Sequence, residues 1–435
     1  MKSIVSNFSH KNHKRLAVLV AAAFVVSAVS YAGCSAASSS AAAEAATDSI
    51  SSARNTPAVY AAKTVGPAVV GITNKAIARD WFDNPVETEG VGSGVINDLT
   101  KLTAHRCGRR YMCVGTAASM DGYTAYGASI TYQGNKQTFD CPAPYGMALD
   151  PRIAAKAPKA MSASGYADLI AKIPAGADWM IADVVGSEAI DRFAFDLVQD
   201  GLQEALSDPE GVYNGDVKKV EQLAEGLLLS GFAMQAAKSS RPASGMEHQF
   251  SHFWDMEDLE FEGKHVSHGF KVGIGTLAST ASLELLLAAP IESLDIDACV
   301  AKWKSWEETE KEILRIFDGK PGFIDRALTE TKNKYVDKEG LRRELTAFKA
   351  AWPELKERIR KQIIPFEEVR RRLKLVGAPY EPEQLGVSRA RFRDTFAKIP
   401  YMRSRFSNID IAYRCGFMDE WLERLFGKGG IWEVE

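Results

Sequence analysis

Residues 90–101 read GVGSGVINDLTK. Gly90, Gly92 and Gly94 make a glycine-rich turn, and Asn97 to Lys101 then open a helix. In such a turn the backbone N–H groups can approach a pyrophosphate, and the N-terminus of the helix adds positive potential. The same pattern also serves strand–helix junctions that bind nothing, so on its own the stretch leaves both interpretations open.

The residues that follow strengthen the nucleotide-binding interpretation. Arg110 to Gly115 (RYMCVG) predict a strand, and the polar loop Thr116 to Gly122 follows its carboxyl end, where open α/β sheets place their ligands. Ser129 to Cys141 alternate in polarity around Gly134-Asn135, which predicts a β-hairpin. We therefore expect a partial NAD(P)-binding α/β domain over residues 90–149.

Beyond residue 150 the pattern changes to helical periodicity, with strand-like runs nearly absent. We expect a large α-helical domain over residues 150–435, which makes the fold class α/β plus all-α. The predicted helices are 164–173, 187–207, 216–238, 277–289, 300–317, 338–351 and 355–375.

The N-terminal residues have a different character. Residues 1–35 place Lys11, Lys14 and Arg15 before an apolar stretch that ends at Gly33-Cys34, which predicts a signal peptide or membrane anchor. Residues 36–56 are rich in alanine and serine and predict a linker. Residues 57–89 form a separate N-terminal fragment.

Composition excludes several classes of protein. The chain has 435 residues with 53 Lys+Arg and 56 Asp+Glu, a net charge of −3, so nucleic acid is not expected as a partner. The 6 cysteines show no CxxC spacing, which argues against a disulfide scaffold and a cysteine zinc site. We expect mostly reduced thiols in a globular protein of two or three domains.

Histidines are clustered. Of 7 histidines, four lie between His248 and His268. His248 and His252 share one helix face because they are four residues apart. Two imidazoles and a carboxylate from different helices would form an open divalent-metal site; the alternative is a pair of hydrogen-bonded core histidines.

Several motifs together resemble the sn-glycerol-1-phosphate dehydrogenases, which belong to the iron-type alcohol dehydrogenase and glycerol dehydrogenase superfamily. The resemblance runs in order over residues 90–435. It is carried by Gly92–Asp98 (GSGVIND), Thr116–Gly122 (TAASMDG), Ala167–Lys172 (ADLIAK), Ser239–His248 (SSRPASGMEH) and His268–Gly273 (HGFKVG).

This resemblance implies a reaction and a set of site residues. The reaction is metal-dependent, NAD(P)H-linked reduction of dihydroxyacetone phosphate to sn-glycerol 1-phosphate, with a glycerol or polyol dehydrogenase as the nearest alternative. The implied ligands of one divalent ion, zinc, nickel or iron, are Asp168, His248 and His268. Asp121 would act at the substrate hydroxyls, and His252 would contact substrate phosphate or water.

The resemblance also implies where NAD or NADP binds and which residues are secondary. The cofactor-binding residues would be Gly92, Ser93, Gly94, Asp98, Thr116 and Ser119. Lys172 and Arg241 are phosphate partners or, alternatively, structural residues. The other expected partners are further copies of the chain and a membrane contacted by the N-terminal apolar segment.

The first half of the nucleotide domain is missing from this pattern. In its place residues 1–96 resemble the N-terminus of HtrA-like, trypsin-fold serine proteases, and the change falls within Gly90–Ile96. Proteolysis is not expected, because no Gly-x-Ser-Gly-Gly nucleophile loop follows and the sequence around His105 is one residue short of a catalytic-histidine signature. The chain therefore reads as a chimera, formed by recombination or by an error of assembly.

The two parts predict different locations. The dehydrogenase body belongs in the cytoplasm with its reduced cofactor, whereas the leader predicts membrane insertion or export. An alternative function follows: a membrane-tethered fusion that retains the metal-binding domain and lacks catalysis.

Overall fold

The computed structural model describes residues 72–73, 88–132 and 135–434. The predicted leader and linker, and most of the fragment over residues 57–89, lie outside the described residues. The strands are β1 Ile72–Thr73, β2 Thr88–Gly92, β3 Tyr111–Gly115, β4 Ala128–Tyr132, β5 Asn135–Phe139, β6 Gly146–Leu149, β7 Glu260–Phe261 and β8 Lys264–His265. The helices are α4 Gly94–Arg106, α5 Pro151–Ala154, α6 Lys159–Ile170, α7 Lys172–Val184, α8 Arg192–Gln199, α9 Leu202–Ala205, α10 Pro209–Asn214, α11 Val217–Ala237, α12 Met246–Met256, α13 His268–Ala288, α14 Ile296–Lys302, α15 Trp306–Ile316, α16 Pro321–Lys334, α17 Lys338–Gln362, α18 Phe366–Val376, α19 Arg389–Lys398, α20 Asn408–Cys415 and α21 Met418–Phe426. Short 3-10 turns are η2 Arg241–Ala243, η3 Ile291–Ser293, η4 Pro382–Leu385 and η5 Ile399–Tyr401.

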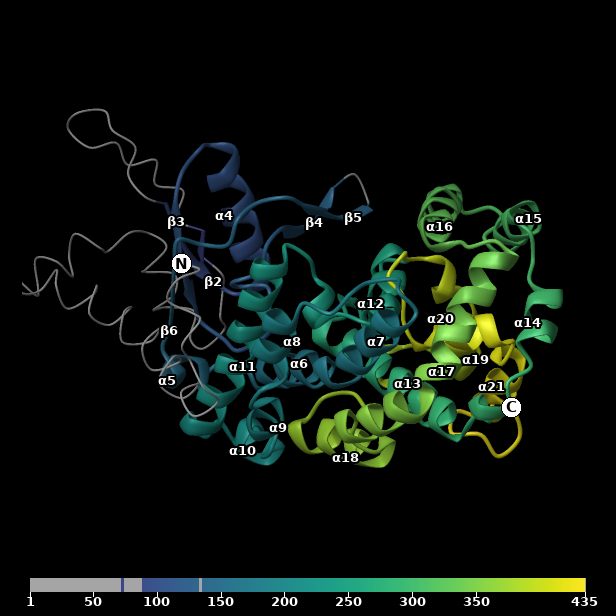
Figure 1. Ribbon diagram of the computed structural model, residues 1–435. Coiled ribbons are helices and arrows are strands. Elements are labelled where there is room, and N and C mark those ends of the chain that lie inside the picture. Colours follow the sequence, from purple (N-terminus) through teal and green to yellow (C-terminus); the bar gives the residue numbers. More distant parts are fainter. Residues whose placement is uncertain (1–71, 74–87, 133–134, 435) are drawn as a thin grey trace, which may run out of the picture.

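A small sheet stands at the N-terminal end of the described chain (Figure 1). Its order is β1-β2-β3-β6, with β2, β3 and β6 parallel and β1 antiparallel to β2. Gly92 is in register with Gly115, and Gly115 with Leu149. The glycine turn after β2 and the polar loop after β3 therefore leave the sheet at the same edge, as we expected from the sequence.

The elements predicted around this sheet are confirmed. The helix expected from Asn97 is α4, which begins at Gly94, and the expected strand is β3. The predicted hairpin is β4–β5, with Tyr132 opposite Asn135. His105 is an exposed residue of α4.

Helices dominate the described chain after Leu149, and some predicted boundaries were wrong. The helix predicted over 187–207 is broken into α8 and α9, because Gly201 adopts a left-handed φ of 81° between them. The helix predicted over 300–317 is interrupted after Lys302, where Ser305 and Glu308 form a capping box that starts α15. Conversely, α17 continues through Pro353, where we expected a break.

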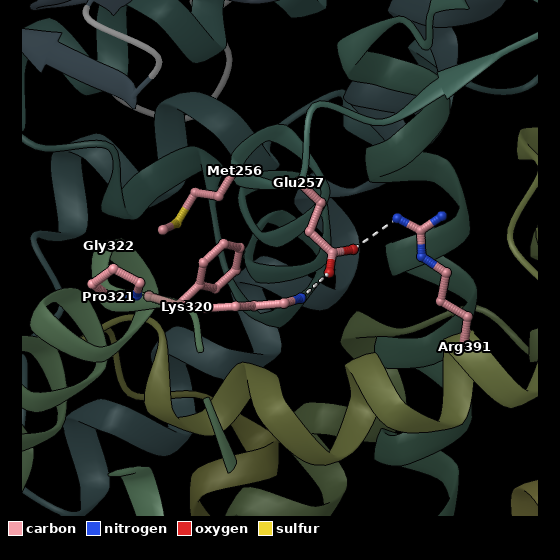
Figure 2. Close-up of a pocket in the computed structure, with 7 residues that line it drawn as sticks. Met256, Glu257, Lys320, Pro321, Gly322 and Arg391 are labelled. Atoms are coloured by element: carbon pink, nitrogen blue, oxygen red, sulfur yellow. Dashed lines mark hydrogen bonds and ion pairs between the residues drawn. The ribbon is translucent and has the colours of Figure 1, made fainter. Parts of the chain in front are cut away.

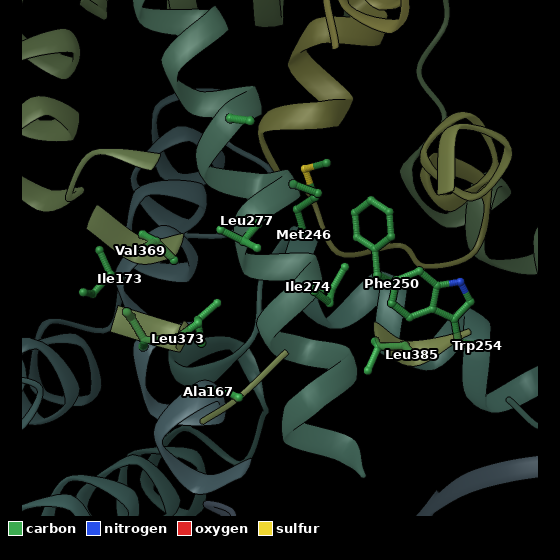
Figure 3. Close-up of a cluster of buried hydrophobic side chains, with 14 of the residues drawn as sticks. Ala167, Ile173, Met246, Phe250, Trp254, Ile274, Leu277, Val369, Leu373 and Leu385 are labelled. Atoms are coloured by element: carbon green, nitrogen blue, oxygen red, sulfur yellow. The ribbon is translucent and has the colours of Figure 1, made fainter. Parts of the chain in front are cut away.

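Helix α13 is the centre of the helical body. Its side chains Ile274 and Leu277 are fully buried and pack among residues of α12 and α18, such as Phe250 and Leu373 (Figure 3). Among the described residues this one helix is long and apolar enough to cross a membrane, but 78% of its apolar window is buried inside the protein. Its apolar character is therefore explained by its place in the core.

Glycines allow the backbones around α13 to approach closely. A Cβ at Gly269 would overlap the main-chain carbonyl of Ser164 in α6, and one at Gly275 would overlap the carbonyl of Glu247 in α12. Both glycines lie on the same helix as His268. The side chains of α6, α12 and α13 that face one another are thereby brought within a few ångströms.

Candidate metal and substrate site

Asp168, His248 and His268 meet where α6, α12 and α13 come together. One ligand atom from each lies within 4.8 Å of the other two. The ring centroids of His248 and His268 are 5.3 Å apart. Asp168 and His248 are buried and His268 is partly exposed. A carboxylate and two imidazoles that open to solvent on one side fit a divalent ion that must also accept a substrate oxygen.

Asp168 is ionised although its side chain is fully buried. Burial alone would raise its pKa, but the neighbouring groups, first of all the ammonium of Lys172, more than offset it, so the pKa lies far below the ordinary value. Lys172 Nζ donates to Asp168 Oδ1 at 2.8 Å. The carboxylate is therefore charged and ready to bind a cation at neutral pH.

Asp121 is joined to the same group of residues. Its Oδ2 lies 2.8 Å from Lys172 Nζ and accepts a hydrogen bond from Ser230 Oγ at 3.0 Å. Its main-chain N–H donates to Asp168 Oδ2 at 3.1 Å. Lys172 is itself fully buried and its pKa is raised, since the two carboxylates outweigh the effect of burial. Lys172 thus has a structural role between two carboxylates.

A second buried lysine fixes the loop that carries Asp121. Lys101 Nζ donates to the carbonyls of Gly122 at 3.1 Å, Ala125 at 3.0 Å and Gly127 at 2.7 Å. Its side chain comes from α4, and only 1% of the residue is exposed. Sequence reasoning missed Lys101, because a lysine on a predicted helix is ordinarily a solvated residue.

His252 lies one turn beyond His248, with ring centroids 6.3 Å apart, and is partly exposed. Ser251 Oγ lies 3.1 Å from Nδ1 of His268. The remaining clustered histidine, His265, is on β8 and forms an exposed group with Asp258 and Glu260, away from the buried centre.

The residues expected at the nucleotide lie around the ends of β2 and β3. Gly92 ends β2, Ser93 is the N-cap of α4, and Thr116 directly follows β3. Thr116 Oγ1 is buried and, within the part of the chain that the structure describes, has no hydrogen-bond partner. An unpaired hydroxyl beside a helix N-terminus, at the carboxyl edge of parallel strands, fits a phosphate-containing ligand.

Other predicted residues have protein partners. Ser119 Oγ lies 3.2 Å from the Tyr123 hydroxyl. Asp98 Oδ2 accepts the main-chain N–H of Ser129 at 3.2 Å, so its carboxylate contacts the β4–β5 hairpin. Arg241 is buried and donates to the carbonyls of Phe406 and Asp178, both at 2.8 Å.

A pocket of about 520 Å³ lies at the far end of α12. Figure 2 shows Glu257 there between Lys320 and Arg391, with which it forms ion pairs at 3.1 and 2.7 Å. Glu257 is nine residues beyond His248, roughly 13 Å along the helix axis at 1.5 Å per residue. The pocket is therefore separate from the group around Asp168.

Comparisons with known proteins give similarity to dehydrogenases. A model of the family described as iron-containing alcohol dehydrogenase matches residues 25–158. Glycerol-1-phosphate dehydrogenase [NAD(P)+] from Geobacillus thermodenitrificans is 34% identical over 205 residues, which are 46% of this chain and 51% of that protein. The enzyme of the same name from Pyrococcus furiosus is 38% identical over 196 residues, 45% of this chain and 56% of that protein.

The chain therefore spans about half the length of the curated relatives that it matches. Among solved structures, glycerol dehydrogenase from Schizosaccharomyces pombe is similar with a TM-score of 0.44 and 16% identity, over 78% of this chain and 71% of that one.

Proposed function

We propose that this chain is a metal-dependent, NAD(P)H-linked reductase of dihydroxyacetone phosphate that forms sn-glycerol 1-phosphate and also catalyses the reverse reaction. The observation that carries the proposal is the convergence of Asp168, His248 and His268 within 4.8 Å. The names of the relatives supply the substrate. The similarity of this chain to those relatives favours this chemistry over a purely structural pair of histidines.

In this proposal Asp168, His248 and His268 hold the divalent ion. When bound, zinc, nickel or iron would act as a Lewis acid toward a carbonyl oxygen. Asp121 and Asp168 carry two negative charges and Lys172 one positive charge, which leaves a net negative site before any cation binds. That negative charge suits a divalent cation. With the cation bound the site would have a net positive charge, which one developing alkoxide would balance.

Asp121 is the residue that we place against the substrate hydroxyls. Lys172 and Ser230 both contact its Oδ2, so the carboxylate has a fixed orientation next to Asp168. A fixed carboxylate costs no reorganisation when the substrate binds. His252, on the partly exposed side of the group, would contact the substrate phosphate or a water molecule.

NAD or NADP would bind at the edge where β2 and β3 end. Gly92, Ser93 and Gly94 would lie along the pyrophosphate, with Thr116 and Ser119 beside them. Asp98 is the least supported of the proposed cofactor residues, because its carboxylate already contacts Ser129 and Lys101.

The experiment is oxidation of NADH and NADPH by the purified full-length chain with dihydroxyacetone phosphate and zinc, nickel or iron. We expect turnover that is lost in D168A and H268A and retained in H265A, a matched control for removal of an exposed histidine. Unphosphorylated dihydroxyacetone is tested as a second substrate, because turnover of it would indicate a glycerol or polyol dehydrogenase. Equal turnover in D168A would refute the metal assignment.

A second candidate is a fusion that binds metal and lacks catalysis, which rests on the prediction that the first half of the nucleotide domain is missing. The matched relatives are about twice as long as the aligned region, and within residues 72–73, 88–132 and 135–434 the sheet has four strands, one of them the two-residue β1. Fluorescence titration with NADH distinguishes the two functions: metal binding without nucleotide binding would support the fusion.

Cytoplasmic location of the dehydrogenase body is part of the first proposal, because the reduced cofactor is there. Association into a homo-oligomer and membrane contact through residues 1–35 are proposals that sedimentation and membrane fractionation would test.

A further inference from the structure

Glu247 lies directly behind the imidazole of His248. Its side chain is fully buried, and its Oε1 is 2.8 Å from His248 Nδ1. The main-chain N–H of Gly245 donates to the same oxygen at 2.5 Å. A fully buried carboxyl group is costly unless it is hydrogen-bonded. Oε1 of Glu247 has these two contacts, and the buried Oε2 has no hydrogen-bond partner within the part of the chain that the structure describes.

The contact with Glu247 fixes the tautomer of His248. A carboxylate oxygen that already accepts an N–H from Gly245 acts as an acceptor, so Nδ1 of His248 carries the proton in that contact. Nε2 of the neutral ring is then left with its lone pair, and it is 3.6 Å from Asp168 Oδ1. Nε2 is thus the nitrogen presented to the centre of the group.

The second histidine contacts a hydroxyl, and not a carboxylate, through its Nδ1. His268 Nδ1 faces the hydroxyl of Ser251 at 3.1 Å, and a hydroxyl can rotate to donate or accept. This contact is compatible with either tautomer of His268. The carboxylate of Glu247 therefore distinguishes His248 from His268.

The backbone around Glu247 is itself held from two sides. On one side α13 approaches so closely that a Cβ at Gly275 would overlap the Glu247 carbonyl. On the other, Asp178 Oδ2 accepts the main-chain N–H of Met246 at 2.7 Å, and its Oδ1 accepts that of Asn408 at 2.8 Å. Gly275 and Asp178 are both buried, so the backbone at Glu247 has little room to move its carboxyl group away from His248.

We propose that Glu247 is a positioning residue that holds His248 in the Nδ1–H tautomer and so presents Nε2 to a divalent cation. The inference rests on the proposed metal site, but it concerns a residue that neither the motif interpretation nor the relatives' names assign. Carboxylates that accept the second N–H of a metal-binding histidine fix its orientation, and their loss ordinarily costs about 10–100-fold in metal affinity.

The test compares E247A and E247Q with E257Q. Glu257 is a matched control, because it is a carboxylate at the other end of the same helix, paired with Lys320 and Arg391 (Figure 2). Zinc affinity is measured by calorimetry on the full chain, and the tautomer of His248 by ¹⁵N NMR of the metal-free protein at a pH at which the imidazole is neutral.

We expect zinc binding about 10–100-fold weaker in E247A, a smaller loss in E247Q, which keeps an acceptor oxygen, and wild-type affinity in E257Q. The NMR spectrum should show Nδ1–H for His248 in the wild type and a mixture in E247A. Wild-type zinc affinity in E247A and E247Q, or an Nε2–H ring in the wild type, would overturn the proposal. If E247A does not fold, the zinc affinity of E247Q and the NMR spectrum of the wild type still test the proposal.

The NMR arm also separates this inference from the proposed function. A wild-type protein that shows the Nδ1–H tautomer but binds no zinc would refute the metal site and leave the contact between Glu247 and His248 intact. A protein that binds zinc with His248 in the other tautomer would refute only the role of Glu247.

Discussion

Lys172→Met tests whether a buried ammonium holds the carboxylates of the site together. Lys172 Nζ lies 2.8 Å from both Asp121 Oδ2 and Asp168 Oδ1, and the lysine side chain is fully buried. Methionine has a similar length and no charge, so the variant leaves two carboxylates with no lysine between them. Removing one partner of a buried ion pair costs about 3–5 kcal/mol, and we expect that loss in the free energy of unfolding.

The assay is urea denaturation followed by circular dichroism, in EDTA and again with zinc. In EDTA the variant should lose about 3–5 kcal/mol. When zinc is present at 100 times the Kd of a given protein, binding to the native state raises the free energy of unfolding of that protein by about 2.7 kcal/mol. The variant should gain more at equal zinc concentration, because its site carries one more net negative charge and binds the cation more tightly.

Lys320→Met is the matched control. Lys320 also pairs with a carboxylate, Glu257, at 3.1 Å, but its side chain is 48% exposed. Exposed ion pairs contribute about 0–1 kcal/mol, so this variant should unfold close to the wild type. A Lys172→Met protein that loses less than about 1 kcal/mol in EDTA would refute the reasoning, because the cost assigned to an uncompensated buried charge would be absent.

Three further predictions follow from other contacts. Gly269→Ala should lower stability by about 1–3 kcal/mol in thermal unfolding, because the added methyl meets the Ser164 carbonyl, and an unchanged midpoint would contradict that close approach. Burial, with the charge of Glu247, raises the pKa of Asp178 to about 7 from its ordinary 3.8. Between these two pKa values the native state holds a proton that the unfolded chain releases. The free energy of unfolding should therefore fall by an amount on the order of 4 kcal/mol as the pH rises from about 4 to 8. Asp178→Asn should flatten that slope in urea denaturation, and an equal slope in both proteins would exclude Asp178 as its cause. Phe250→Ala should cost about 3–5 kcal/mol, because the ring is fully buried beside Phe392 and Phe396, and a loss below 1 kcal/mol would show that the core closes over the cavity.

Local signals in the sequence predicted the sheet region well. The glycine turn and the alternation around Gly134-Asn135 are governed by neighbouring residues, and α4, β3 and the β4–β5 hairpin formed as expected. Helix boundaries were predicted less well where tertiary packing or capping decided them. Pro353 lies inside α17, and the capping box of Ser305 divides a run of helical periodicity.

The candidate site shows the same division. His248 and His252 could be placed on one helix face from their spacing, and the proposed trio came from motif resemblance. The partners of those residues could not be predicted, because Lys172, Lys101 and Glu247 have meaning only through contacts across the fold. Lys101 contacts carbonyls more than twenty residues away, and no pattern of neighbouring residues indicates which carbonyls these are.

The loop that follows β3 has a consequence for how two ligands would influence each other. Thr116 begins the loop at the edge of the sheet, and Asp121, five residues later, is bonded to Asp168 in the helical body. One short segment therefore borders both the proposed nucleotide edge and the proposed cation. Binding equilibria that share such a segment are reciprocal: whatever factor the nucleotide adds to the affinity for the cation, the cation adds to the affinity for the nucleotide. Titrating each ligand in the presence of the other would give one coupling energy measured twice.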